Sequence, residues 1–247
     1  MAEAAVVIPT FNERENIEAM LRALLAVHSG LEVLVVDDQS PDGTGARVAE
    51  LARECPRIVL IANPVRAGFG PSLAIGFAEA FRRGCTKVLQ MDADFSHPVA
   101  VVPRLLEGLE DADLVIGSRY VEGGSTPGWP RRRRLLSRGG GFYTRLILGV
   151  PCRDVTAGFK AWRADLLRRI EPHTIVSGGY GFQIESVYRA HRLGARIREI
   201  PIEFVDRRAG TSKMSGKIIL EALLNVPRLR LRRWAPGSGE VTSAGAR

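Results

Sequence analysis

The sequence predicts an α/β fold in which a mostly parallel central sheet is flanked by helices. Short apolar runs alternate with longer segments whose apolar residues recur at helical spacing, a pattern typical of βαβ units. Strands joined in this way run parallel, and their crossovers are right-handed. The chain has 247 residues, 45% of them hydrophobic, which is enough for one such domain.

Five strands are expected to alternate with four helices in the first half of the chain. The first helical segment, 14–27, places Ile17, Leu21 and Leu24 on one face, and the apolar runs on either side of it are short enough for strands. The expected strands are 4–8, 32–36, 58–62, 88–91 and 114–117, and the expected helices are 14–27, 43–53, 72–82 and 99–109.

The second half of the chain has a different composition. A loop rich in Gly, Pro and Ser, 123–130, precedes four consecutive arginines. A helix is expected over 135–148, then strands over 159–162 and 196–204 with a helix over 182–193 between them, and a helical segment rich in Leu, Ile and Arg over 214–231. We predict one domain over 1–234 and a disordered tail over 235–247, which is small and polar.

The composition favours a basic intracellular protein. The formal net charge is +8, and only four of the 35 cationic residues are lysines. Arginine forms bidentate contacts with phosphates, so clusters of it suit phosphorylated ligands or anionic surfaces. The three cysteines lack metal-site spacing, which indicates reduced thiols in the cytoplasm. We expect neither a signal peptide nor a membrane-spanning helix.

An acidic motif follows the expected strand at 88–91. If the strand continues, Asp92 and Asp94 point to the same side, at the carboxyl end of the sheet where α/β proteins bind ligands. Two adjacent carboxylates suit a hard divalent cation such as Mg²⁺ or Mn²⁺. The alternative is a turn with solvated acids, and the short motif alone leaves both interpretations open. His97 is expected to be a structural hydrogen-bonding residue of the turn.

Polar clusters also follow the first two strands, at 9–13 and 37–44. No glycine-rich phosphate loop accompanies them, which argues against a Rossmann dinucleotide site. The segment 66–70 predicts a tight turn that carries Arg66 near the site. These clusters suit a nucleotide bound through its base and ribose, with a diphosphate bridged by a metal on Asp94.

Basic residues in the later chain are candidates for phosphate binding. They are Arg119, the arginine run 131–134 with Ser137, and Arg207 with Lys213. For the arginine run, a merely solvated charged face remains the alternative.

Six motifs occur in one order along the chain: PTFNE, VVDDQSPDGT, QMDADFSHP, GSRY, DVTAGFK and EIPIEFVDRRAGTSKM. From residue 4 to residue 230 the chain resembles the family 2 glycosyltransferases of GT-A fold, and more narrowly the dolichol- or polyprenol-phosphate mannose synthases. This resemblance implies a GDP-mannose donor, a polyprenyl-phosphate acceptor, and Mg²⁺ or Mn²⁺ as cofactor.

The resemblance also implies residue roles. Asp94 matches the metal ligand, with Asp92 beside it and Ser96 where many relatives carry Gln. Arg207 and Lys213 match catalytic positions near the donor diphosphate, alongside Asp94 and Arg119. The positions that match acceptor-phosphate residues are Arg119, Arg133 and Ser137, and those that match nucleotide-binding residues are Pro9, Phe11, Glu13, Val36, Asp38, Asp92 and Ala93.

The implied reaction is a single in-line displacement with inversion at the anomeric carbon. A phosphate monoester is ionised at neutral pH, so this nucleophile needs no dedicated general base. UDP-glucose is the alternative donor. An enzyme with a hydroxyl acceptor would want a catalytic Asp or Glu that we do not identify. The acidic strand ends argue against a basic module for nucleic acid.

A lipid acceptor requires access to a membrane. Helices at about 131–150 and 214–234 combine apolar faces with arginines, which suits amphipathic interfacial helices attracted to anionic lipid. Ordinary core packing is the alternative for both. We therefore expect a peripheral protein on the cytoplasmic face of the membrane, with a membrane-anchoring partner subunit as a further possibility.

Overall fold

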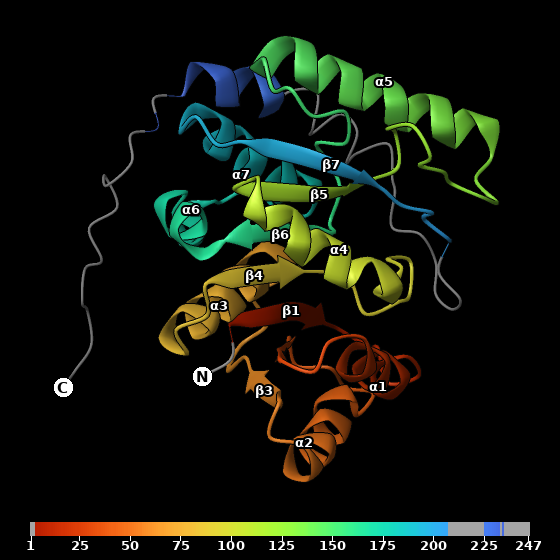
Figure 1. The fold of residues 1–247 in the computed structure, drawn as a ribbon, viewed down its shortest axis with the longest axis vertical. Coiled ribbons are helices and arrows are strands. Elements are labelled where there is room, and N and C mark those ends of the chain that lie inside the picture. The colour runs from red at the N-terminus through yellow and green to blue at the C-terminus, as the bar shows by residue number, and fades with distance from the viewer. Residues whose placement is uncertain (1–2, 207–224, 233, 235–247) are drawn as a thin grey trace.

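A seven-stranded sheet forms the centre of the molecule, and helices cover both of its faces (Figure 1). The computed structural model describes residues 3–206, 225–232 and 234. The strand order is β3-β2-β1-β4-β6-β5-β7; β6 runs antiparallel to β4 and β5, and the other neighbours are parallel. The strands are β1 Ala4–Thr10, β2 Leu31–Asp37, β3 Ile58–Ala62, β4 Lys87–Gln90, β5 Leu114–Ser118, β6 Lys160–Arg163 and β7 Ile197–Pro201.

The central strands are buried on both faces. In β1, Ala5 and Val7 pack into one hydrophobic cluster, whereas Val6 and Ile8 pack into the other. Successive side chains of a strand point to opposite faces, so a continuous apolar run supplies both clusters at once. This burial fixes the register of the sheet and so the positions of the loops at its carboxyl edge.

Two layers of helices enclose the sheet. Helices α1, α2 and α4 contribute to the cluster that contains Val6, and α3, α6 and α7 contribute to the cluster that contains Val7. The α-helices are α1 Ile17–Val27, α2 Thr44–Glu54, α3 Phe69–Arg82, α4 Val102–Glu107, α5 Arg131–Leu148, α6 Ala164–Arg169 and α7 Tyr180–Arg192; short 3₁₀ helices are η1 Val99–Val101, η2 Gly108–Glu110 and η3 Pro172–Thr174.

The predicted α/β architecture with a mostly parallel sheet is confirmed, and each predicted strand has a counterpart. Two helix predictions need correction. The arginine run belongs to α5, which begins directly after Pro130, because proline suits the entry to a helix. The helix expected over 99–109 is divided into η1, α4 and η2. Helix α6 was not predicted.

The C-terminal region is described only in part. Residues 225–231 are helical and lie beside α5 (Figure 1), while 207–224 and the predicted tail 235–247 lie outside the described residues. The second predicted interfacial helix is therefore described only over its last part. Among the helices that the structure describes, none combines the length and apolar character needed to cross a membrane.

Candidate active site

A pocket of about 540 Å³ opens at the carboxyl edge of the sheet. One side of it is formed by segments that follow β1, β2 and β4, which carry Phe11, Asp38 and Asp94. The loop before α7, the first turns of α5, and the helix at 225–231 supply the opposite side. The topology thus brings together polar clusters that lie far apart in the chain. They meet at the carboxyl ends of parallel strands, where α/β proteins bind their ligands.

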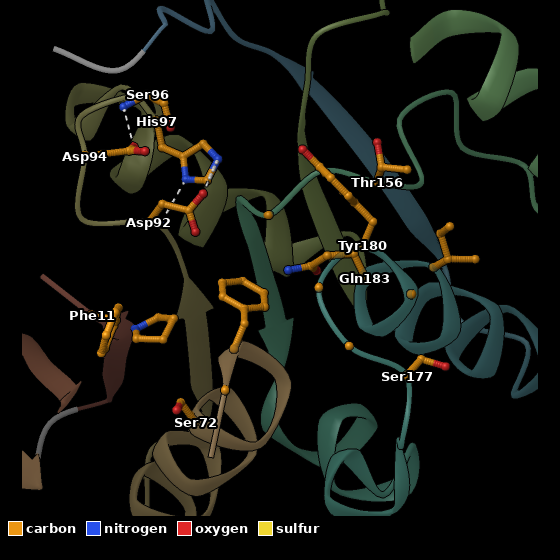
Figure 2. Close-up of a pocket in the computed structure, with 18 of the residues that line it drawn as sticks. Phe11, Ser72, Asp92, Asp94, Ser96, His97, Thr156, Ser177, Tyr180 and Gln183 are labelled. Carbon is orange, nitrogen blue, oxygen red and sulfur yellow. Dashed lines mark hydrogen bonds and ion pairs between the residues drawn. The ribbon is translucent and has the colours of Figure 1, made fainter. Parts of the chain in front are cut away.

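The acidic motif lies in a turn rather than in a continuing strand. Strand β4 ends at Gln90, and Phe95 adopts a left-handed backbone conformation with φ 60°. The Ser96 N–H donates to Asp94 Oδ1 at 3.0 Å, which fixes the turn from within (Figure 2). Asp92 and Asp94 both line the pocket, so the predicted convergence of the two acids is right although the strand geometry behind it is wrong.

His97 is a structural residue of this turn, as predicted. The Asp92 N–H donates to His97 Nδ1 at 3.0 Å (Figure 2). The imidazole stacks on Phe159 with centroids 5.0 Å apart. Burial lowers the pKa of His97, although the Asp92 and Asp94 carboxylates act in the opposite direction. The ring is therefore a neutral acceptor at Nδ1, which holds Asp92 in place.

The acidic turn offers oxygen ligands of the kind that Mg²⁺ and Mn²⁺ prefer. Asp92 and Asp94 supply carboxylates, and the buried Ser96 hydroxyl has no hydrogen-bond partner among the described residues. No set of three His, Cys, Asp or Glu side chains suited to a metal gathers within the described part of the chain. Such a site fits a cation that takes its remaining ligands from water and substrate phosphates, as Mg²⁺ commonly does.

Asp38 organises the side of the pocket where the sequence analysis expects the nucleotide. Its carboxylate accepts hydrogen bonds from Asn63 Nδ2 at 3.0 Å, the Ala67 N–H at 2.7 Å and the Gly68 N–H at 2.8 Å. Partial burial raises the pKa of Asp38, but the hydrogen bonds outweigh it, and the net effect is a lowered pKa. Asp38 therefore stays ionised and shapes the loop that precedes α3.

That loop places Arg66 over the ring of Phe11, with the guanidinium carbon 3.8 Å from the ring centroid. Both residues line the pocket, together with Pro9 and Glu13. The position of Arg66 near the site confirms what the sequence predicted. The stacked pair is a flat, partly cationic surface of a kind that suits a nucleobase or a phosphate.

Arg119 reaches the pocket already bound to Asp154. Its Nε donates to Asp154 Oδ2 at 2.8 Å, and Nη2 donates to Asp154 Oδ1 at 2.6 Å and to Thr156 Oγ1 at 2.9 Å. Burial acts to lower the pKa of Arg119, but the Asp154 carboxylate dominates and raises it. The guanidinium is thus a fixed, permanent cation at the pocket wall.

Arg133 lies at the pocket mouth, at the start of α5. Its Nη1 donates to Asp206 at 2.7 Å, and its guanidinium carbon is 3.9 Å from the centroid of the Trp129 ring. The buried Arg133 Nε has no hydrogen-bond partner among the described residues. This part of the arginine run is therefore half-buried in the site, whereas Arg131 and Arg132 are exposed.

Two predicted residues that the structure describes stand apart from the pocket lining, and two others lie outside the described residues. Val36 is buried within β2, and Ser137 bonds to the Tyr120 hydroxyl at 2.6 Å; neither lines the pocket. Arg207 and Lys213 lie outside the described residues. The predicted residues that do line the pocket are Pro9, Phe11, Glu13, Asp38, Asp92, Ala93, Asp94, Ser96, Arg119 and Arg133.

The sequence analysis missed the loop 177–181, which forms one wall of the pocket. An ion pair buried within α7, Arg189 with Glu185, holds it: Glu185 accepts from Ser177 Oγ at 3.0 Å, and Arg189 donates to Thr174 Oγ1 at 2.6 Å. The only sequence signal was three glycines around Ser177 and Tyr180. Gln183, which also lines the pocket, gave no signal.

Comparison with known proteins agrees with this geometry. The family model described as Glycosyl transferase family 2 matches residues 5–171. The chain is 46% identical to the undecaprenyl-phosphate mannosyltransferase of Micrococcus luteus, over 92% of this chain and 94% of that protein. It is 43% identical to the polyprenol monophosphomannose synthase of Mycolicibacterium smegmatis, over 92% of this chain and 86% of that protein.

Solved structures share the fold at lower identity. A mannosyltransferase from Pyrobaculum calidifontis in complex with GDP-Man and Mn²⁺ has a TM-score of 0.63 at 20% identity, covering 95% of this chain and 65% of that chain. Glucosyl-3-phosphoglycerate synthase from Mycobacterium tuberculosis, in complex with Mn²⁺, UDP and glucosyl-3-phosphoglycerate, has a TM-score of 0.67 at 22% identity, covering 93% and 80%. These matches establish the GT-A fold of the chain.

Proposed function

Because the chain belongs to glycosyl transferase family 2 and is a glycosyltransferase, we propose that it transfers mannose from GDP-mannose to a polyprenyl phosphate. The observation that carries this proposal is that one pocket is lined by both an acidic and a basic group of residues. Acidic residues at the sheet edge face fixed arginines across it. The names of the two relatives supply the sugar and the acceptor class.

The donor is assigned to the acidic side of the pocket. Phe11 with Arg66 and the carboxylates of Glu13 and Asp38 suit the nucleoside. A divalent metal, Mg²⁺ or Mn²⁺, would be held by Asp94 with Asp92 and Ser96 nearby. It would supply a Lewis acid that neutralises charge on the departing diphosphate. The Mn²⁺ and GDP-Man bound to the Pyrobaculum protein support this assignment.

The acceptor phosphate is assigned to the basic side. Arg119 is held rigid by Asp154 and can orient an anion at little further cost in conformational entropy. Arg133 has an unpartnered Nε at the pocket mouth, where a phosphate on a long chain would enter. Ser137, Arg207 and Lys213 remain predicted contributors on the strength of the family resemblance.

The chemistry needs positioning more than proton transfer. The acceptor oxygen is already ionised, so the protein must hold two anions in line and stabilise the charge on the leaving group. His97 is neutral and buried in the turn, which agrees with a mechanism without a histidine base. We propose in-line attack with inversion at the anomeric carbon.

Helix α5 is the proposed contact with the membrane. Leu135, Phe142 and Leu146 are exposed and follow one another along one face of the helix. Arg132 and Arg138 lie on the two sides of that stripe, where they can meet anionic headgroups. The helix begins at the pocket mouth, so a lipid acceptor could reach Arg133 from the membrane surface. This arrangement supports a peripheral location on a membrane.

The deciding experiment measures the transfer of labelled mannose from GDP-mannose to a short polyprenyl phosphate, with and without a chelator. We expect transfer that chelation abolishes and added Mn²⁺ or Mg²⁺ restores. Asp94→Asn removes the metal-binding charge at constant shape and should lower transfer by at least about a hundredfold. Asp165→Asn, at an exposed position of α6, is the control and should stay within about twofold.

The same assay separates the alternatives. Transfer of glucose from UDP-glucose in preference to mannose would replace the donor assignment and keep the acceptor. Transfer that withstands both chelation and Asp94→Asn would remove the metal from the proposal. Transfer to a sugar hydroxyl, with polyprenyl phosphate unused, would overturn the proposed acceptor.

A further inference from the structure

The side-chain amide of Gln183 presents an unpartnered N–H at the pocket. Gln183 lies in the first turn of α7, is only 2% exposed and lines the cavity. Its Nε2 is buried and has no hydrogen-bond partner among the described residues. In Figure 2 the side chain extends from α7 toward the middle of the pocket, on the side of Asp92.

The orientation of this amide follows from a chain of donors that cannot be reversed. Trp162 Nε1 can only donate, and it donates to Gln90 Oε1 at 3.2 Å. Gln90 Nε2 therefore faces the other way, where it donates to the Gly158 carbonyl at 3.1 Å and to Gln183 Oε1 at 2.9 Å. The carbonyl end of the Gln183 amide is thus directed into the protein.

Lys160 fixes the same orientation independently. Its Nζ donates to Gln183 Oε1 at 2.6 Å and to the Gln183 backbone carbonyl at 3.1 Å. In its ammonium form a lysine can only donate, so the carbonyl oxygen of the Gln183 amide, and not its NH₂ group, occupies this position. With two donors on Oε1, Nε2 is left facing the pocket. A buried donor without an acceptor is destabilising, so a ligand oxygen is the natural partner.

The surroundings of Gln183 favour a negatively charged oxygen. The N-terminus of α7 is directed at the pocket, since Gly179, Tyr180 and Gly181 all line it, and helix N-termini attract anions. Lys160 lies directly behind the amide. Among the neighbouring carboxylates, Asp154 is paired with Arg119 and Glu185 with Arg189, whereas Asp92, toward which the amide extends, is assigned above to the metal on the donor side.

We propose that Gln183 Nε2 donates a hydrogen bond to a phosphate oxygen of the polyprenyl-phosphate acceptor at the N-terminus of α7. This inference rests on the function proposed above and adds a residue to its acceptor site. A glutamine carries no titratable proton, so Gln183 binds and orients a nucleophile that is already ionised. Gln90 and Lys160 act as positioning residues that hold the amide in the donating orientation.

Two binding measurements test this inference separately from transfer. Calorimetry would follow a short polyprenyl phosphate in detergent, the matching polyprenol without phosphate, and GDP-mannose with Mn²⁺. Gln183→Glu keeps the length of the side chain and lets one oxygen accept from Lys160, but it presents an acceptor to the pocket. Ser29→Glu is the control, because Ser29 is exposed, lies outside the pocket lining and the polar clusters at the strand ends, and gains the same charge.

We expect Gln183→Glu to weaken binding of the polyprenyl phosphate at least tenfold, since a hydrogen bond to a charged group is lost. Its KM for the acceptor should rise in parallel, while the Kd for GDP-mannose stays within about twofold of the wild type. Gln183→Asn, which withdraws the donor without adding charge, should act in the same direction. The Ser29→Glu control should bind both ligands normally.

Unchanged acceptor binding in both Gln183 variants would overturn the inference, and so would a loss confined to GDP-mannose. A wild type that binds polyprenyl phosphate through Gln183 but transfers no mannose would refute the proposed function and leave the inference standing. Lys160→Met should raise the acceptor KM at constant donor Kd, a split that a merely structural role would not produce.

Discussion

Arg119 lines the pocket while its guanidinium group forms an ion pair with Asp154. Asp154 is fully buried and accepts two guanidinium hydrogen bonds, so the pair is desolvated as a unit. Such a pair adds little net stability, but removing one partner leaves an uncompensated buried charge. The conformational entropy of the Arg119 side chain is therefore lost when the protein folds, and little more is lost when a ligand binds.

A comparison of two Asp→Asn variants tests this arrangement. Asp154→Asn should lower the free energy of unfolding by about 3–5 kcal/mol, because Arg119 stays buried without its counterion. Asp165→Asn breaks an exposed pair with Arg168 and should change it by less than about 0.5 kcal/mol. Urea unfolding of both variants gives the values; equal, small changes would contradict the proposed role of Asp154.

The residues of the site differ in how far the sequence predicted them. Asp92 and Asp94 were predicted because their spacing after an apolar run is a local signal. Gln183 and Asp154 were not, because each acquires its role only from partners that are distant in sequence, such as Lys160 and Arg119. An orphaned donor becomes visible only when its neighbours have been placed in space.

At the scale of elements, α5 combines two roles along its length. Its first turn carries Arg133 into the pocket, and its outer face exposes Leu135, Phe142 and Leu146. The apolar periodicity predicted a helix only from 135, whereas the amphipathic interfacial helix expected at about 131–150 includes the arginine run, as α5 does. Arginine is a good helix former, and Pro130 is compatible with the position before the first turn.

The exposed stripe of α5 is testable by vesicle flotation. The double variant Phe142→Gln and Leu146→Gln should reduce binding to vesicles containing anionic phospholipid by at least about tenfold at low salt, since apolar area is no longer buried in the lipid. Val65→Gln is the control: it removes a similarly exposed apolar side chain from the loop before α3, far from α5 in the sequence, and should leave vesicle binding unchanged. Equal binding by all variants and the wild type would exclude α5 as the contact.

At the scale of the whole molecule, a lysine is enclosed between the sheet and α7. Lys160 has no exposed surface, and burial lowers the pKa of its ammonium group to about 7, while Cys152 and Asp154 act in the opposite direction. An unfolded lysine titrates near 10.4. Below pH 7 the folded protein therefore carries the full cost of a buried charge, and that cost is relieved as the pH rises above 7.

The consequence is a pH-dependent stability that Lys160→Met removes. Between pH 7 and 8.5 the unfolded chain binds the extra proton, so the free energy of unfolding of the wild type should rise relative to Lys160→Met by up to about 1.4 kcal/mol per pH unit. Urea unfolding of both proteins at pH 6.5, 7.5 and 8.5 measures this difference. Over this range the thiol of Cys152 stays protonated, because burial raises its pKa to about 12. A difference that does not vary with pH would show that Lys160 titrates normally.

The sequence by itself determined the alternation of strands and helices, the parallel core, and the acidic ends of the first, second and fourth strands. These features depend on side-chain periodicity and on the residues next to each strand, which are local in the chain. Motifs in order along the chain were also sufficient to indicate the family, and the match over residues 5–171 agrees.

Only the tertiary structure decided which polar residues share one pocket and which of them already have hydrogen-bond partners within the protein. It distinguished Gln183, whose Nε2 has no partner among the described residues, from Asp38, whose carboxylate accepts hydrogen bonds from the loop before α3. It also brought the loop 177–181 opposite the acidic turn through contacts within and around α7. The physical reason is that hydrogen bonding and burial are set by neighbours in space, which the order of residues along the chain does not specify.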